Sequence, residues 1–276
     1  NAANRLTGGA GNDTYVIGAG DSIVESVNAG IDSVQSSVTH TLAANVENLT
    51  LTGTATINGT GNGLNNILIG NSAVNTLTGG AGNDTYIVGA GDTVVEALNA
   101  GTDTVQSAVT WSLGANVENL VLVGSAAVNG TGNTLANVLT GNAGNNALVG
   151  GDGNDTMAGG QGNDVLNGGT GKDGFQFARG DGQETVTDPS GSSDRLNFGS
   201  GINPLDIMLS QSANDLRIAL YGSTDQVTIA NWYGGATNQI ETVQAGNGQQ
   251  LMSTQVNQLI QAMAGFTQQT GLSWEQ

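Results

Sequence analysis

The sequence has no cysteine, two prolines and one histidine among its 276 residues. Without cysteine the chain cannot use disulfides for stability or perform thiol catalysis. Basic residues are also scarce: 5 Lys and Arg stand against 23 Asp and Glu, giving a formal charge of −18. Such an acidic excess repels nucleic acid and anionic membranes and attracts cations. No apolar run approaches the length of about 18 residues that a membrane-spanning helix needs.

Catalytic motifs are missing as well. The single histidine, His40, has no matched Asp and Ser neighbours, and its counterpart in a second copy of the same stretch is Trp111. The sequence contains no GxSxG, HExxH or GxxxxGK[ST] motif. We therefore interpret His40 as a strand-surface residue and expect no enzymatic activity.

Glycine is abundant instead, with 45 residues, and its spacing is periodic. Residues 150–176 read GGDGNDTMA, GGQGNDVLN and GGTGKDGFQ, three nine-residue units in register that carry Asp155, Asp164 and Asp173 at their sixth position. Glycines let the backbone turn tightly, so main-chain carbonyls can converge, and the aspartate adds a carboxylate. Oxygens of this kind are the ligands that Ca²⁺ prefers. The remaining three residues of each unit suit one short strand with an inward apolar side chain.

These tandem nonapeptides resemble the calcium-binding repeats of the RTX (repeats-in-toxin) family. The resemblance implies an all-β fold, a parallel β-roll or β-helix solenoid with a β-rich C-terminal cap and one terminal helix. It also implies several bound Ca²⁺ ions, and export by type I secretion machinery to the cell surface or the extracellular space. In such rolls turns i and i+2 stack and share an ion, with carbonyls and aspartates from both turns as ligands.

Carried onto this sequence, the resemblance implies three ligand sets and leaves a fourth incomplete. The sets are Gly151, Gly153 and Asp155 with Gly168, Thr170 and Asp173; Asn142, Gly144 and Asn146 with Gly159, Gln161 and Asp164; and Asn62, Leu64 and Asn66 with Gly79, Ala81 and Asp84. An Asn amide oxygen can ligate Ca²⁺ without charge, but Asn can equally form only turns or hydrogen-bond ladders between coils. Asp13 occupies the matching place in the first copy, where we expect a truncated site.

Two long copies precede the tandem block, at an offset of 71 residues: NRLTGGAGNDTYVIGAGDSIVE returns as NTLTGGAGNDTYIVGAGDTVVE. Such repetition indicates stacked units with a continuous core. We divide the chain into two repeat units at 1–74 and 75–145, a tandem β-roll at 146–195, a capping segment at 196–251, and a helix with a secretion-signal region at 252–276. The chain begins at Asn1 without Met or a leader, and we expect it to be part of a longer protein.

A second acidic pattern, GDxxxExxxxGxD, follows each long-copy nonapeptide. It supplies Glu25 and Asp32 in the first copy and Glu96 and Asp103 in the second. Both a calcium role and a solvated acidic face fit these residues. Glu47 and Glu118, in the recurring NVENL, are interpreted as surface or cap groups.

The C-terminal part resembles the segment that closes RTX rolls. Glu184 and Asp188 stand where late ligands occur in that family, with Glu184 in place of the more usual Asp. In the terminal helix, Ser253 is the expected N-cap and Gly265 the expected end. An apolar stripe predicts its buried face: Val256, Leu259, Ile260 and Met263.

These observations favour a monomeric, non-catalytic module that folds on binding Ca²⁺ outside the cell. The alternative is a carbohydrate- or surface-binding module of an adhesin or an alginate epimerase-like enzyme, for which Trp111, Trp232 and Tyr233 are the available aromatics. Ice binding is excluded, because the Thr-Asn pairs at Thr60 and Thr131 are too few to form an array.

Overall fold

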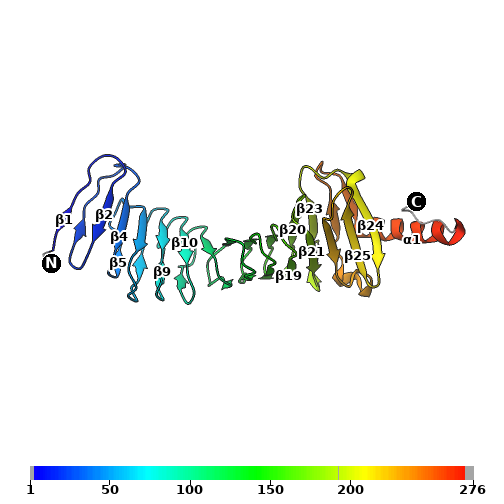
Figure 1. Cartoon of the computed structure of the whole chain (residues 1–276), viewed down its shortest axis with the longest axis horizontal. Coiled ribbons are helices and arrows are strands. Elements are labelled where there is room, and N and C mark those ends of the chain that lie inside the picture. Colours follow the sequence, from blue (N-terminus) through cyan, green and yellow to red (C-terminus); the bar gives the residue numbers. More distant parts are fainter. Residues whose placement is uncertain (1–2, 192, 271–276) are drawn as a thin grey trace. The chain divides into compact units, whose positions relative to one another are not determined.

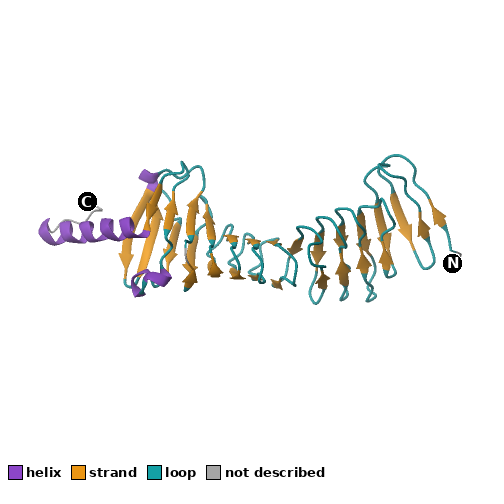
Figure 2. Ribbon diagram, turned by 180° about the vertical axis from the view of Figure 1, so that it is seen from behind, coloured by secondary structure: helices purple, strands orange, loops and turns teal. Residues whose placement is uncertain are grey.

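The computed structural model describes residues 3–191 and 193–270. The chain divides into two compact units, Asn1–Val123 and Gly124–Gln276. Each unit is a β-solenoid of short strands joined by turns (Figure 1), and the second ends in one α-helix (Figure 2). The structure therefore confirms the predicted all-β solenoid. Within the described ranges, no helix has the length and apolar character to cross a membrane.

In the first unit the strands of each coil alternate between two faces. One face is a fully parallel sheet made of β2 (Thr14–Ile17), β4 (Ser33–Ser36), β6 (Asn48–Leu51), β8 (Ile67–Ile69), β10 (Thr85–Val88), β12 (Thr104–Ser107) and β14 (Asn119–Leu122). The other face holds β1 (Arg5–Leu6) paired with β3 (Ser22–Ile23), the sheet of β5 (His40–Thr41), β7 (Gly59–Thr60), β9 (Thr76–Thr78) and β11 (Thr93–Val95), and then β13 (Trp111–Ser112). His40 thus lies on a strand, as predicted.

The second unit repeats this arrangement and then changes it. One face contains β16 (Val138–Thr140), β18 (Thr156–Ala158), β20 (Gly174–Phe177), β23 (Arg195–Phe198) and β27 (Thr242–Gln244) in parallel, with β28 (Gln250–Met252) antiparallel at the end. The other contains β15 (Gly130–Thr131), β17 (Ala147–Asp152), β19 (Val165–Gly171), which also pairs with β22 (Ser190–Gly191), and β21 (Gln183–Thr187). It continues through β26 (Gln226–Ile229) into antiparallel β25 (Asp215–Leu220) and β24 (Ile207–Ser212).

The core is a narrow stack of apolar side chains, because alternate residues of each short strand point inward. Strand register places Leu49, Leu68 and Tyr86 on successive coils, and all three are fully buried. The two faces meet at Gly59, where a Cβ would contact both Leu49 and Leu77. Successive coils of the first unit therefore contribute inward side chains to one core.

The C-terminal cap concentrates the bulky residues that the glycine-rich coils lack. It includes the 3₁₀ turns η1 (Pro204–Asp206), η2 (Trp232–Gly234) and η3 (Ala236–Asn238). Trp232 is fully buried, and its indole N–H donates to Asn257 Oδ1 at 2.7 Å. Phe177 and Phe198 pack edge to face with ring centroids 5.7 Å apart. The antiparallel strands and these aromatic side chains therefore cover the last coils, as expected for a cap.

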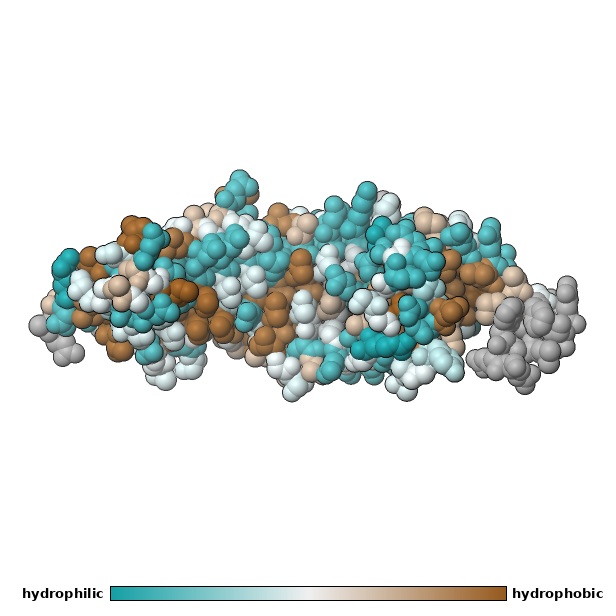
Figure 3. Space-filling view, turned by 90° about the horizontal axis from the view of Figure 1, so that it is seen from above, coloured by the Kyte–Doolittle hydropathy of each residue, from teal (hydrophilic) through white to brown (hydrophobic). Residues whose placement is uncertain are grey.

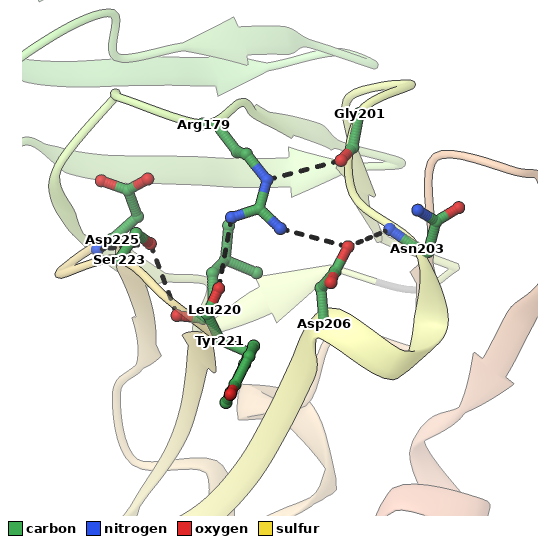
Figure 4. Close-up of polar contacts among 8 residues, drawn as sticks. All are labelled: Arg179, Gly201, Asn203, Asp206, Leu220, Tyr221, Ser223 and Asp225. Atoms are coloured by element: carbon green, nitrogen blue, oxygen red, sulfur yellow. Dashed lines mark hydrogen bonds and ion pairs between the residues drawn. The ribbon is translucent and has the colours of Figure 1, made fainter.

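Arg179 ties a turn of the roll to this cap (Figure 4). Its guanidinium forms an ion pair with Asp206 at 3.1 Å and donates to the carbonyl oxygens of Gly201 and Tyr221, each at 3.4 Å. The backbone N–H of Asn203, followed by this guanidinium, holds the pKa of Asp206 below its usual range. The Arg179–Asp206 pair is the one ion pair that the described part of the chain contains.

Helix α1 spans Ser253–Thr270 and packs its first turns on the cap. Val256 and Ile260 are buried there, whereas Leu259 is 44% exposed, so the predicted apolar stripe is only partly covered. The helix begins at the predicted residue, but Gly265 does not end it. Glycine in a helix interior costs only about 1 kcal/mol relative to Ala, which one unfavourable residue in a longer helix can tolerate.

Candidate metal centre

The nonapeptide turns stack closely, and their glycines make this possible. Gly151 and Gly153 adopt φ values of 113° and 117°, a left-handed conformation that favours glycine. In the turn of the next coil, a Cβ on Gly169 or Gly171 would clash with the carbonyl oxygen of Gly151 or Gly153. The carbonyls of one turn therefore face the turn of the following coil, as the resemblance implied.

One oxygen of each turn carboxylate accepts a backbone hydrogen bond from the coil before it. Asn137 N–H donates to Asp155 Oδ1 at 2.7 Å, and Asp155 N–H donates to Asp173 Oδ1 at 2.8 Å. The series continues from Asp173 N–H to Asp194 Oδ1 and from Asp194 N–H to Glu241 Oε2, both at 2.7 Å. We call this series the carboxylate ladder. It fixes the orientation of each aspartate in its turn.

The second oxygen of these carboxylates has no such partner. Asp155 Oδ2, Asp164 Oδ2 and Asp173 Oδ2 are buried and accept no hydrogen bond from the described residues. Each points at the first glycine of its own turn, where any Cβ would fill the space that the oxygen occupies. Buried charged oxygens without partners are costly, so this arrangement calls for a cation or for protons.

In the first unit, the nonapeptide aspartates meet the residues of the second acidic pattern. Asp84, Glu96 and Asp103 are buried and each offer a carboxylate oxygen within 4.8 Å of the others. The equivalent residues of the first copy converge in the same way: Asp13, Glu25 and Asp32. Asp13, which we expected to sit in a truncated site, thus finds its partners in the following coil.

A tyrosine contributes to both of these groups. Tyr86 Oη donates to Glu96 Oε1, and Tyr15 Oη donates to Glu25 Oε1. A Cβ on Gly79 would clash with Asp84 Oδ2, Tyr86 Oη and Glu96 Oε1 together. In the second copy, the space beside Gly79 is therefore surrounded by three side-chain oxygens.

Burial dominates the electrostatics of the more enclosed copy. It raises the pKa of Asp84 to about 6 and that of Glu96 to about 7, with the neighbouring Asp103 carboxylate adding to both effects. In the first copy the hydrogen bond from Tyr15 instead lowers the pKa of Glu25. A nearby positive charge would favour the ionised form of such enclosed carboxylates.

The tandem block and its closing turns form further acidic groups. Asp173, Asp188 and Asp194 are buried with oxygens within 4.8 Å of one another. Burial raises the pKa of Asp188 to about 8, and it raises that of Glu184, beside Asp164, to about 9. Glu184, which lies in β21, accepts a backbone hydrogen bond as the turn aspartates do: Asp164 N–H donates to its Oε2 at 3.2 Å.

Sequence reasoning missed Asp194, although a signal for it exists. Asp194-Arg-Leu-Asn-Phe repeats the spacing of Asp173-Gly-Phe-Gln-Phe, with Asp before a strand whose alternate residues are apolar. It also interpreted Glu47 and Glu118 as surface or cap groups, and both are half-buried. Each accepts a backbone hydrogen bond as the members of the carboxylate ladder do: Glu47 from the N–H of Asp32 at 2.7 Å, and Glu118 from that of Asp103 at 2.8 Å.

The predicted Asn-containing sets are also brought together as stacked turns. Asn66 N–H donates to Asp84 Oδ1 at 2.6 Å, and Asn146 N–H donates to Asp164 Oδ1 at 2.7 Å. The third-position residues of the later turns, Ala81 and Gln161, are exposed at the outer edge. The amides of these asparagines, unlike the aspartates, already have hydrogen-bond partners within the protein.

The donor set fits Ca²⁺. The clusters consist of Asp and Glu, so they supply oxygen atoms, and several of these are buried carboxylate oxygens without a partner. Ca²⁺ takes six to eight such oxygens in flexible geometry. A divalent ion bound here would offset the repulsion between neighbouring carboxylates.

Stacked coils with oxygen-rich glycine turns define a metal-binding β-roll. Family comparison agrees: the model of the RTX calcium-binding nonapeptide repeat matches in four copies, at residues 1–24, 60–95, 131–166 and 140–175. The haemolysin-type calcium binding protein related domain matches residues 215–249, within the cap. The chain therefore contains an RTX calcium-binding repeat region, as the resemblance indicated.

Proposed function

We propose that this chain is a non-catalytic module that folds when it binds Ca²⁺ after secretion and serves as a structural segment of a larger extracellular protein. The observation that carries this proposal is the set of three carboxylate clusters, two of them fully buried, each with three oxygens within 4.8 Å. Several like charges cannot share a buried site unless a counter-charge or protons neutralise them. At neutral pH, a calcium ion supplies that counter-charge.

The ions would be held by the clustered carboxylates, assisted by carbonyls of the stacked turns. The proposed carboxylate ligands fall into five groups: Asp13, Glu25 and Asp32; Asp84, Glu96 and Asp103; Asp155 with Asp173; Asp173 with Asp188 and Asp194; and Asp164 with Glu184. The carbonyl ligands that the family resemblance implies, including those of Gly151, Gly153, Gly168 and Thr170, stay predictions.

Binding to the folded state alone makes folding depend on the concentration of free Ca²⁺. Each site contributes about 2.7 kcal/mol when free Ca²⁺ is 100 times its dissociation constant. Several sites therefore suffice to decide whether a domain of ordinary marginal stability is folded. A chain that stays unfolded where Ca²⁺ is scarce can pass a type I exporter and fold outside, and RTX repeats are characteristic of secreted proteins.

The carbohydrate-binding alternative lacks support from its aromatic candidates. Trp111 is 9% exposed and Trp232 is 0% exposed, so neither presents a ring to a sugar. Tyr233 is half-buried, and its hydroxyl oxygen is buried. The visible surface mixes hydrophobic and hydrophilic side chains (Figure 3). We therefore propose calcium-dependent folding as the function.

Far-UV circular dichroism during a Ca²⁺ titration at pH 8 tests the proposal, with Mg²⁺ as the ion control. The test variant combines Asp155→Ala with Asp173→Ala, and the matched control is Asp152→Ala, which removes an exposed charge from the same turn. We expect a cooperative gain of β-structure with Ca²⁺ and none with Mg²⁺. The midpoint of this transition should move to a higher Ca²⁺ concentration in the test variant and stay unchanged in the control variant. A chain already fully folded in chelator at this pH would refute it.

A further inference from the structure

The turns at equivalent places in the coils fall into two sequence classes. Five read Gly-Gly-x-Gly-x-Asp, at 8–13, 79–84, 150–155, 159–164 and 168–173. Four read Gly-Asn-x-x-x-Asn, at 61–66, 70–75, 132–137 and 141–146. The second and sixth positions change together, from Gly and Asp to Asn and Asn. Paired change at two positions of one turn points to a contact between them.

The two classes differ in backbone conformation. In the Gly-Gly class the second and fourth residues have positive φ, as in Gly160 at 89° and Gly162 at 129°. Asn142 and Gly144, at the same positions of the 141–146 turn, do not adopt positive φ. Instead Gly144 N–H donates to Asn142 Oδ1 at 2.8 Å, an Asx turn that holds the loop in another shape. The carbonyls of this class are therefore arranged differently.

The sixth-position asparagine closes the Asn turn from within. Asn146 Oδ1 accepts the N–H of Asn142 at 2.8 Å. Its Nδ2 donates to Val128 O of the preceding coil at 2.6 Å and to Asn142 Oδ1 at 3.1 Å. Asn146 is buried, so these bonds satisfy both N–H groups and the oxygen of the amide where water is excluded.

The same bonds recur in the first unit. Asn75 Oδ1 accepts the N–H of Asn71 at 2.7 Å, and Asn75 Nδ2 donates to Ile57 O at 2.6 Å and Asn71 Oδ1 at 3.1 Å. Asn66 Nδ2 likewise donates to Glu47 O at 3.1 Å and to Asn62 Oδ1 at 3.3 Å. In the Gly-Gly class the matching aspartate keeps one buried oxygen without a partner.

We propose that the Gly-Asn-x-x-x-Asn turns bind no calcium, because the amide NH₂ of the sixth residue takes the place of the ion. The NH₂ group carries partial positive charge and links an oxygen of its own turn to a carbonyl of the preceding coil. A calcium ion would make the same link between stacked turns. Calcium ions would thus link the stacked Gly-Gly-x-Gly-x-Asp turns, and asparagine amides link the Gly-Asn-x-x-x-Asn turns. This inference rests on the proposed calcium binding of the Gly-Gly class.

A two-residue change converts one class into the other. Asn142→Gly with Asn146→Asp makes residues 141–146 read GGAGND, identical to 8–13 and 79–84. Isothermal titration calorimetry of the whole chain, with Ca²⁺ as titrant, measures the number of ions bound. We expect the double variant to bind one ion more than the unaltered chain. Asn145→Asp adds a single negative charge at an exposed place in the same turn and should bind no additional ion.

A second variant keeps the test decisive if the conversion disturbs folding. Asn146→Ala removes the amide, so it should lower the melting temperature in saturating Ca²⁺ and leave the ion count unchanged. A count that falls by one in Asn146→Ala would make Asn146 a ligand and overturn the proposal. A folded double variant with an unchanged count would overturn it too. If the unaltered chain binds no Ca²⁺ at all, the proposed function fails, which is a separate result.

Discussion

Lowering the pH in the presence of a chelator should fold the metal-free chain. Burial raises the pKa of Asp84 to about 6, of Glu96 to about 7 and of Asp155 to about 6 in the folded state. In an unfolded chain such carboxylates titrate near pH 4. The folded chain therefore keeps protons that the unfolded chain releases. The resulting penalty on folding is absent below about pH 4 and fully developed above about pH 7.

The size of this penalty decides whether the metal-free fold is stable. Each pKa unit corresponds to about 1.4 kcal/mol, so these three groups together destabilise the ionised fold by at most on the order of 10 kcal/mol, before solvent screening is counted. That equals the whole stability of many domains, which lies between about 5 and 15 kcal/mol. Even half of it would keep the chelated chain largely unfolded at pH 8.

Circular dichroism in EDTA from pH 8.5 to pH 4.5 measures the effect. We expect β-structure to increase as the pH falls, because protons then neutralise the clusters in place of calcium. Asp155→Asn should shift this transition to higher pH, whereas Asp152→Asn, which removes an exposed charge from the same turn, should shift it little. A chelated chain whose β-content stays constant or decreases toward pH 4.5 would refute the reasoning.

Three further outcomes follow from the packing. Gly79→Ala should remove one bound ion, because its Cβ would displace three oxygens. Gly63→Ala is the control, since a Cβ there meets nothing within 4 Å, and calorimetric ion counts compare the two variants. Leu166→Ala should destabilise the calcium-saturated fold by about 2 to 5 kcal/mol, measured by urea unfolding, since Leu166 is 1% exposed; a loss below 1 kcal/mol would contradict a packed core. Arg179→Ala should cost only about 1 kcal/mol, because its pair with Asp206 is partly exposed, and unchanged salt dependence of the melting temperature would argue against the ion pair.

The fold could be predicted because its determinants are local and repeated. A nine-residue period with glycines at fixed places specifies a turn and a short strand, and tandem copies specify stacking. The same reasoning located Asp155, Asp164 and Asp173, whose spacing is constant within the tandem block. Strong periodicity leaves few alternative registers.

The acidic groups of the first unit could not be derived in the same way, because its coils differ in length. Thr85 pairs with Thr104, 19 residues on, whereas Thr104 pairs with Asn119, only 15 residues on. Which carboxylates come together depends on the path of the connecting turns, which differ in length from coil to coil. The role of the asparagines was equally hidden, since sequence alone does not distinguish an amide that ligates from one that donates.

The direction of the carboxylate ladder makes each turn of the second unit depend on the coil that follows it. Each backbone N–H finds its acceptor in the coil that follows it in sequence, from Asn137 to Asp155 and from Asp173 to Asp194, and the series ends on Glu241. A coil is therefore complete only after its C-terminal neighbour has formed. Ribosomal synthesis delivers these coils in the opposite order. The N-terminal turns of this unit therefore depend on acceptors that are synthesised after them, and a chain cut short before Glu241 would leave the last donor of the series without its carboxylate.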